Sequence, residues 1–145
     1  MVIDVGAAIA EDTNALISEL MTVREAVPQP VVLKVIVESA ALTEQQLRTA
    51  VRACITVGAD YVKTSTGFHP AGGATVRAVE IMAEELDKAG KLASVSLSDA
   101  ERAEHHLIGI KASGGIRDWD TAVAMIAAGA TRLGVSAPGA ILDPS

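Results

Sequence analysis

The chain has 145 residues and a formal net charge of −6, and half of its residues are hydrophobic although only 2% are aromatic. This length predicts one domain with an aliphatic core, and the acidic balance argues against nonspecific nucleic-acid binding, which needs a basic surface. No apolar run approaches the ~20 residues that span a membrane, the N-terminus lacks the pattern of a signal peptide, and the single cysteine, Cys54, excludes an intrachain disulfide and a thiolate metal cluster. We therefore expect a cytoplasmic protein without membrane or nucleic-acid partners.

The first part of the chain alternates an apolar run, a helical pattern and a second apolar run. Residues 2–5 read as a short strand that ends at Gly6. Residues 11–27 place apolar side chains at helical spacing, and the pattern stops at Pro30 and its neighbours. Residues 31–37 are almost continuously apolar, as buried parallel strands are.

A capping box predicts where the next helix begins. Thr43 suits the N-cap, and Gln46 stands three residues further on, where its side chain can bond back to the cap. The helical pattern continues to about Val57 and ends at Gly58, a residue type that favours helix termination. Residues 59–65 then read as the third strand.

The second half repeats this alternation. Residues 75–89 have helical spacing, and the polar segment 98–106 is expected to be an extra helical turn or a loop. Residues 107–112 form the fourth predicted strand. Asp118 is placed to cap the next helix, and residues 132–136 form the fifth strand, followed by a short tail.

Five strands that alternate with helices predict a parallel α/β architecture. An open doubly wound sheet and part of a (β/α)8 barrel both fit this order. No glycine-rich nucleotide motif follows the first strand, and chemically interesting residues stand at the ends of several strands, which favours the barrel. A whole barrel needs about 250 residues, so we expect residues 1–145 to form a single, incomplete TIM-barrel domain with five βα units.

Two lysines stand near the ends of predicted strands. Lys63 and Lys111 each follow β-branched residues and precede a glycine-containing turn. An amine held beside another amine has a lowered pKa, which makes it a nucleophile toward carbonyls. The alternative is that each stem packs while its ammonium reaches water. Lys34 is predicted to point inward as well, either toward the chemistry or in a buried ion pair with Glu38.

These segments resemble deoxyribose-phosphate aldolase, a class I aldolase family with a (β/α)8 fold. The resemblance runs along essentially the whole chain and implies that it corresponds to strands four to eight, the C-terminal five-eighths of the barrel. The VKTSTG and KASGGIR segments, in this order, are its most specific marks. The matching segments are MVIDVG (1–6), LKVIVE (33–38), GADYVKTSTGF (58–68), GGATV (72–76), IKASGGIRDWDTA (110–122) and GATRLGVS (129–136).

The resemblance implies reversible cleavage of 2-deoxyribose 5-phosphate to glyceraldehyde 3-phosphate and acetaldehyde. By motif, Lys63 forms the Schiff base, and Lys111 perturbs it and assists proton transfer. Neighbouring parallel strands lie about 4.8 Å apart, so inward lysines on adjacent strands can nearly touch. A protonated imine is itself the electron sink, so no metal or other cofactor is expected.

Small residues after the strands are candidates for binding the phosphate. Paired glycines before a helix free backbone N–H groups for an anion, although ordinary turn glycines are an equally simple interpretation. Where relatives commonly have a second serine after the last strand, this chain has Ala137, which predicts weaker phosphate binding. The candidate phosphate-binding residues are Thr66, Gly67, Gly114, Gly115 and Ser136.

The chain departs from the family at its start. The family's catalytic aspartate falls directly before the segment matching Met1, so a chain that begins there has an incomplete proton relay and an open barrel edge. A misassigned start, a truncated gene, or a homo-oligomer that covers the edges would each account for this. The competing functions are another class I phosphosugar aldolase, which use of acetaldehyde as donor would separate, and a noncatalytic phosphate-binding fragment.

Overall fold

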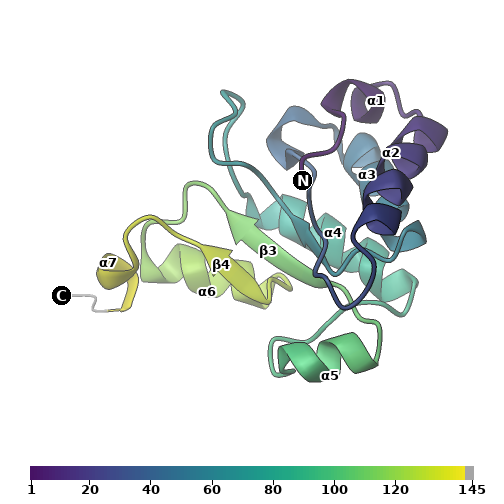
Figure 1. Cartoon of the computed structure of the whole chain (residues 1–145). Coiled ribbons are helices and arrows are strands. Elements are labelled where there is room, and N and C mark those ends of the chain that lie inside the picture. The colour runs from purple at the N-terminus through teal and green to yellow at the C-terminus, as the bar shows by residue number, and fades with distance from the viewer. Residues whose placement is uncertain (143–145) are drawn as a thin grey trace.

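The computed structural model describes residues 1–142, which form one parallel β-sheet with the larger helices packed on its outer side (Figure 1). The strands are β1 (Lys34–Ile36), β2 (Tyr61–Lys63), β3 (Gly109–Ser113) and β4 (Arg132–Gly134). Each strand pairs in parallel with the next one in the chain, in the order β1-β2-β3-β4. A doubly wound sheet reverses direction at a switch point. The consecutive order therefore confirms a partial (β/α)8 barrel.

The prediction of a full first strand over residues 2–5 is wrong. Val2 makes an isolated parallel bridge to Ile36, and the Ile3 N–H donates to the Ile36 carbonyl at 3.0 Å. The chain then turns into a helix, because the Asp4 carboxylate accepts a hydrogen bond from the Ala7 N–H at 3.0 Å and caps it. Within the described residues, the first predicted strand is thus reduced to one bridge beside a four-stranded sheet.

The predicted helices are present, with ends that differ by a few residues from the predicted ones. The capping box is confirmed: Thr43 Oγ1 accepts from the Gln46 N–H at 3.3 Å, and Gln46 Oε1 accepts from the Thr43 N–H at 2.9 Å. Asp118 also caps its helix as predicted. The main helices and the first short one are α1 (Val5–Ile9), α2 (Thr13–Ala26), α3 (Glu44–Thr56), α4 (Val76–Lys88) and α6 (Trp119–Ala127), with a 3-10 turn η1 (Ser39–Ala41).

Two short helices replace segments whose form the sequence left open or missed. The polar segment forms α5 (Asp99–Glu104), which begins at a second capping box between Ser98 and Glu101. The predicted tail contains α7 (Pro138–Leu142). Proline suits a first helical position because its missing N–H would have no partner there. No helix in the described part of the chain is both long and apolar enough to cross a membrane.

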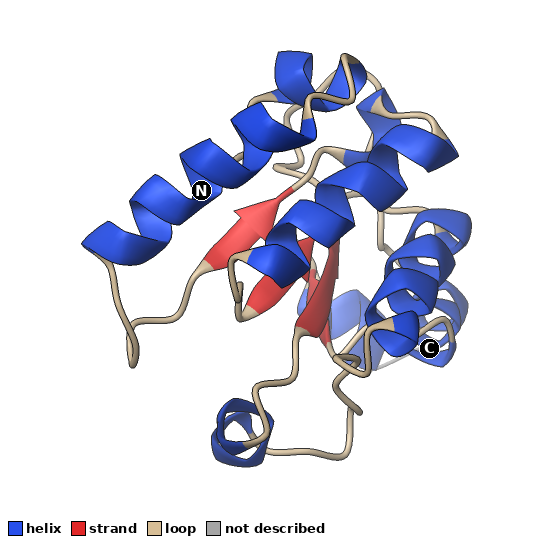
Figure 2. Ribbon diagram, turned by 90° about the vertical axis from the view of Figure 1, so that its right-hand side faces the viewer, coloured by secondary structure: helices blue, strands red, loops and turns tan. Residues whose placement is uncertain are grey.

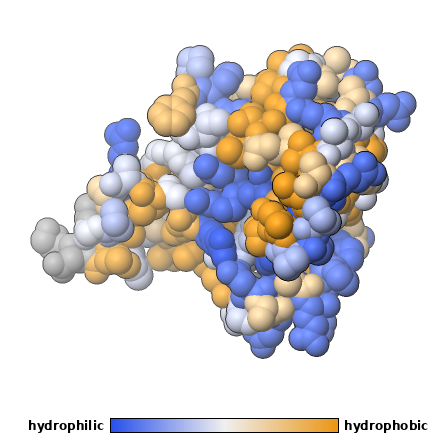
Figure 3. All heavy atoms as spheres, viewed as in Figure 1, coloured by the Kyte–Doolittle hydropathy of each residue, from blue (hydrophilic) through white to orange (hydrophobic). Residues whose placement is uncertain are grey.

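The two faces of the sheet differ sharply in polarity. The side chains of Val35, Val62, Ile110 and Ala112 are fully buried, and Figure 2 shows helices covering one side of the sheet. Cys54 also belongs to this core, and burial raises the pKa of its thiol to about 12. Figure 3 shows a hydrophilic patch at the centre of the opposite side of the molecule. The residues that alternate with the core positions along the strands include Lys34, Tyr61, Lys63, Lys111, Ser113 and Arg132.

Candidate functional site

The structure brings the two candidate lysines side by side on the polar face of the sheet. Lys63 ends β2, and its register partner on β3 is Lys111. Ile36 lies beside Lys63 on β1, and Arg132 lies beside Lys111 on β4. Residues in register on neighbouring parallel strands point to the same face. The two amines therefore stand in one layer of the would-be barrel interior.

A cavity of about 410 Å³ opens at the carboxyl ends of these strands. Every residue predicted for the site lines it: Lys63, Thr66, Gly67, Lys111, Gly114, Gly115 and Ser136. The sequence motifs did not indicate the remaining lining residues of this cavity. These residues are Ser113, Ile116, Arg117, Gly134 and Val135.

The environment of Lys63 favours the neutral amine. Burial lowers its pKa most, and the positive charge of Lys111 lowers it further, while Glu38 acts in the opposite direction. Within the described residues, neither Lys63 nor Lys111 forms an ion pair. An amine that is neutral more of the time is a better nucleophile toward a carbonyl carbon.

The two loops that carry the site are bonded to each other. Thr64 and Ser65 are fully buried. The Ser113 N–H donates to Thr64 Oγ1 at 3.0 Å, and Thr64 Oγ1 donates to the Ser113 carbonyl at 3.1 Å. Ser65 Oγ donates to the same carbonyl at 2.6 Å, and Ser113 Oγ donates to the Ser65 carbonyl at 3.1 Å. Buried, mutually satisfied hydroxyls of this kind hold a loop in one geometry, so the segments after Lys63 and Lys111 are fixed relative to each other.

Glycine is required where the loops approach most closely. Gly114 has φ +89°, and a Cβ there would lie 2.8 Å from the Gly73 Cα. A Cβ on Gly73 would in turn lie 2.4 Å from the Gly114 carbonyl oxygen. Gly134 makes room for the neighbouring strand, since a Cβ there would lie 3.1 Å from Lys111 Cε. The sequence indicated glycines in turns. Gly134 instead lies in a strand, and the register of the strands explains why a larger residue would collide there with the neighbouring strand.

The helix after Gly115 is a weaker anion site than its position in the sequence suggests. The Asp118 carboxylate already accepts from the Thr121 N–H at 2.8 Å at the start of α6. A negative side chain at a helix N-terminus competes with any other anion there. The glycine loop and Arg117 also line the cavity and lie outside this cap.

Lys34 points to the polar face but does not pair with Glu38. Its Nζ lies 5.5 Å from the centre of the Tyr61 ring, against which Arg102 and Arg132 also pack. The Tyr61 hydroxyl donates to Asp99 on α5, which also accepts from Arg132. Burial lowers the pKa of Lys34, as do the charges of Lys111 and Arg132. Of the two alternatives for Lys34, the ion pair with Glu38 is therefore wrong, because Glu38 turns toward the loop after β2 instead.

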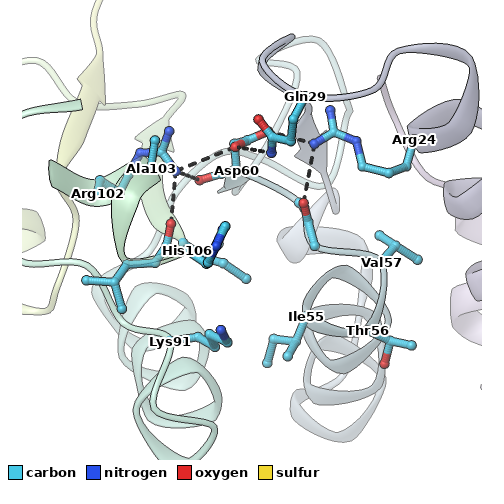
Figure 4. Close-up of a pocket in the computed structure, with 14 residues that line it drawn as sticks. Arg24, Gln29, Ile55, Thr56, Val57, Asp60, Lys91, Arg102, Ala103 and His106 are labelled. Atoms are coloured by element: carbon cyan, nitrogen blue, oxygen red, sulfur yellow. Dashed lines mark hydrogen bonds and ion pairs between the residues drawn. The ribbon is translucent and has the colours of Figure 1, made fainter. Parts of the chain in front are cut away.

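A second cavity, of about 400 Å³, lies at the amino ends of the strands around Asp60 (Figure 4). Asp60 accepts from Arg24 at 3.0 Å, from the Gln29 amide at 3.2 Å and from the Leu33 N–H at 2.8 Å. Arg102 approaches it to 3.7 Å. These partners satisfy the Asp60 carboxylate, which indicates a structural role. Among the described residues, no group of three or more His, Cys, Asp and Glu side chains could hold a metal ion.

Relatives and solved structures of similar fold carry aldolase names. The chain is 70% identical over 142 residues to a deoxyribose-phosphate aldolase of Corynebacterium jeikeium, which covers 98% of the chain and 57% of that relative. It is 51% identical over 147 residues to a deoxyribose-phosphate aldolase of Mycobacterium tuberculosis, covering 99% and 57% respectively. No protein-family model matches the chain.

Among solved structures, an aldolase named QR15 aligns with a TM-score of 0.73 at 36% identity, covering 97% of this chain and 54% of its own. A tetrameric deoxyribose phosphate aldolase from Aeropyrum pernix aligns with a TM-score of 0.67 at 28% identity, covering 90% and 48%. The chain thus spans little more than half the length of the curated relatives it matches. Along almost its whole length, the chain is similar to deoxyribose-phosphate aldolases, which confirms the resemblance indicated by its motifs.

Proposed function

We propose that the chain carries the Schiff-base site of a class I aldolase that cleaves 2-deoxyribose 5-phosphate to glyceraldehyde 3-phosphate and acetaldehyde. The observation that carries the proposal is the register pair of Lys63 and Lys111 at one cavity. A deoxyribose-phosphate aldolase of Corynebacterium jeikeium matches the chain at 70% identity. The chain covers 57% of that relative. The complete reaction is therefore proposed for the whole protein.

The first half of the reaction uses the neutral amine of Lys63. Its Nζ adds to the aldehyde carbon of the open-chain sugar. One proton is taken up and the carbonyl oxygen leaves as water, which gives a protonated imine. When the carbon–carbon bond breaks, its electron pair moves toward the imine nitrogen and the sugar hydroxyl loses a proton, so that glyceraldehyde 3-phosphate is released. The remaining enamine takes up a proton at carbon, and water then releases acetaldehyde and frees Lys63.

Lys111 has two roles in this scheme. As a cation beside Lys63, it favours the neutral, nucleophilic form of that amine. As a proton carrier on the same face, it can give a proton to the departing oxygen and take one back later. The glycine loop, Ser136 and Arg117 line the same cavity, where their donors suit the phosphate of the substrate.

The proposal also covers the oligomeric state and the cellular role of the protein. The deoxyribose phosphate aldolase from Aeropyrum pernix is a tetramer. We propose self-association of this chain too, by analogy with that tetramer. A role in cytoplasmic deoxyribonucleotide catabolism follows from the proposed substrate.

Turnover of 2-deoxyribose 5-phosphate tests the proposal. We expect both acetaldehyde and glyceraldehyde 3-phosphate to form with the unaltered chain and with Lys91→Met, and neither product to form with Lys63→Met. Products from a different phosphosugar alone would support another class I aldolase. Binding of inorganic phosphate without any aldehyde product would contradict catalysis and support a phosphate-binding fragment.

A further inference from the structure

Glu38 is a buried acid at the edge of the candidate site that the proposed reaction has not used. It is 3% exposed and lies just beyond the end of β1. It stands two residues beyond Ile36, the register partner of Lys63, and its backbone has φ +52°. A non-glycine residue in the left-handed region is uncommon and costs energy, so the fold holds this carboxylate in place against a local preference.

The two oxygens of Glu38 have different surroundings. Oε1 accepts a hydrogen bond from the Thr66 N–H, in the loop that follows Lys63. Oε2 is buried and has no hydrogen-bond partner among the described residues. A buried carboxylate oxygen without a donor is costly. Its neighbourhood therefore favours a cation or an N–H group that can come close to it.

The charges around Lys63 identify that cation. Lys111 faces Lys63 from β3, and Glu38 faces it from the end of β1; these two charges act on Lys63 in opposite directions. Lys34 on β1 and Arg132 on β4 add positive charge to the same face. Within the described residues, Glu38 is thus the one acid whose charge acts on the Lys63 amine.

We propose that Glu38 is the counter-ion of the protonated imine that forms at Lys63, while its other oxygen anchors the loop at Thr66. This role rests on the proposed function, because it needs an imine at that lysine. The amine adds to the carbonyl carbon, one proton is consumed and water leaves, so a neutral nitrogen becomes a cation beside the Lys111 ammonium. A carboxylate on the other side offsets that repulsion and keeps the imine protonated, which is the form that withdraws electrons. Glu38 acts through Lys63 and is a positioning residue.

Three variants separate the charge of Glu38 from its hydrogen bond. Glu38→Gln keeps an oxygen for the Thr66 N–H but loses the charge. Glu38→Asp keeps the charge and moves it back by one methylene group. Glu80→Gln makes the same charge change at an exposed position on α4 and is the matched control. Thermal unfolding of each variant shows that it is folded.

The readout is reductive trapping with acetaldehyde and cyanoborohydride, which reduces protonated imines, followed by peptide mapping of Lys63. Glu38→Gln should lower the Lys63 adduct about tenfold, the scale of a lost hydrogen bond to a charged group. Glu38→Asp should fall between this variant and the unaltered chain, and Glu80→Gln should match the unaltered chain. If Glu38→Gln does not fold, Glu38→Asp decides the matter. The proposal would be overturned if Glu38→Asp formed as much Lys63 adduct as the unaltered chain.

A second readout does not require aldehyde chemistry. Side-chain resonances of lysines labelled biosynthetically with ¹³C, with Lys63 assigned from Lys63→Arg, follow its titration directly. Loss of the Glu38 charge should lower the pKa of Lys63, because the carboxylate holds that pKa up. An unmoved Lys63 titration and an undiminished adduct in Glu38→Gln would overturn the counter-ion role alone. No adduct in the unaltered chain would overturn the proposed function, and the counter-ion role with it.

Discussion

The two ends of the sheet differ in whether their charged side chains are paired. At the amino ends, the Asp60 carboxylate is surrounded by Arg24, Gln29, the Leu33 N–H and Arg102. At the carboxyl ends, Lys63 and Lys111 stand together without an ion pair among the described residues. Both ends border cavities of about 400 Å³, so cavity size does not distinguish them. Removing one partner of a buried ion pair leaves an uncompensated charge and destabilises a fold, whereas charges of one sign held together change each other's protonation and create reactivity.

Removing the amine at the carboxyl end should have the largest effect on function. Lys63→Met is expected to abolish both imine trapping and aldehyde release, because no other side chain replaces the nucleophile. The matched control is Lys91→Met, which removes a lysine that lines the cavity at the opposite end. Equal trapping in the two variants, measured by mass spectrometry, would contradict the assignment of Lys63.

Removing the acid at the amino end should have the largest effect on stability. Asp60→Asn leaves Arg24 and Arg102 buried without their counter-charge, which is expected to cost about 3–5 kcal/mol. Urea unfolding measures this loss, with Asp87→Asn on the exposed side of α4 as the control. The comparison fails if the two variants unfold at the same urea concentration.

A smaller change at the carboxyl end should disturb the lysine pair through packing. Gly134→Ala places a Cβ 2.7 Å from Ser113 Cβ and 3.1 Å from Lys111 Cε, so β3 or the lysine must shift, at about 1–3 kcal/mol. We expect reduced trapping at Lys63 together with lower stability. Gly139→Ala, which meets no atom within 4 Å, is the control. Unchanged trapping in Gly134→Ala would show that the position of Lys111 is not critical.

The smallest expected effect concerns the ion pairs between the helices, whose contribution to stability depends on pH. Burial alone would raise the pKa of Glu85, but Arg52, Arg48 and Lys88 lower it from 4.5 to about 2. A depressed carboxylate pKa contributes stability that is complete above 4.5 and is lost as the pH falls toward 2. Glu85→Gln should therefore flatten the acid limb of the unfolding curve between these values. An identical acid limb in both proteins would count against these ion pairs.

Local sequence signals predicted the parts of the fold that local chemistry determines. The Thr43 and Gln46 capping box and the Asp118 cap lie where the sequence placed them. The prediction of a first strand was wrong because of another local cap. Asp4 caps a helix, and this helix replaces the predicted strand. α7 was missed because five residues are too few to show a helical period.

The site residues that lie within sequence motifs could be predicted. Those that depend on the three-dimensional fold could not. Lys63 and Lys111 could be proposed from their segments, and the sheet places them in register. The role of Glu38 depends on its left-handed backbone and on its bond to Thr66, neither of which an alternating strand pattern contains. Alternation put Lys34 and Glu38 on one face, but it could not show that Glu38 turns to the loop instead of to Lys34.

Competition among the lysines of the unaltered chain for acetaldehyde under borohydride tests the central claim most directly. Intact mass followed by peptide mapping reports where the ethyl group of about 28 Da is attached. The contrast between the two ends of the sheet predicts a single adduct on Lys63 at neutral pH, with Lys91 at the other end unmodified. Adducts spread over Lys88 and Lys91 as much as over Lys63 would contradict it, because exposure alone would then explain the reactivity.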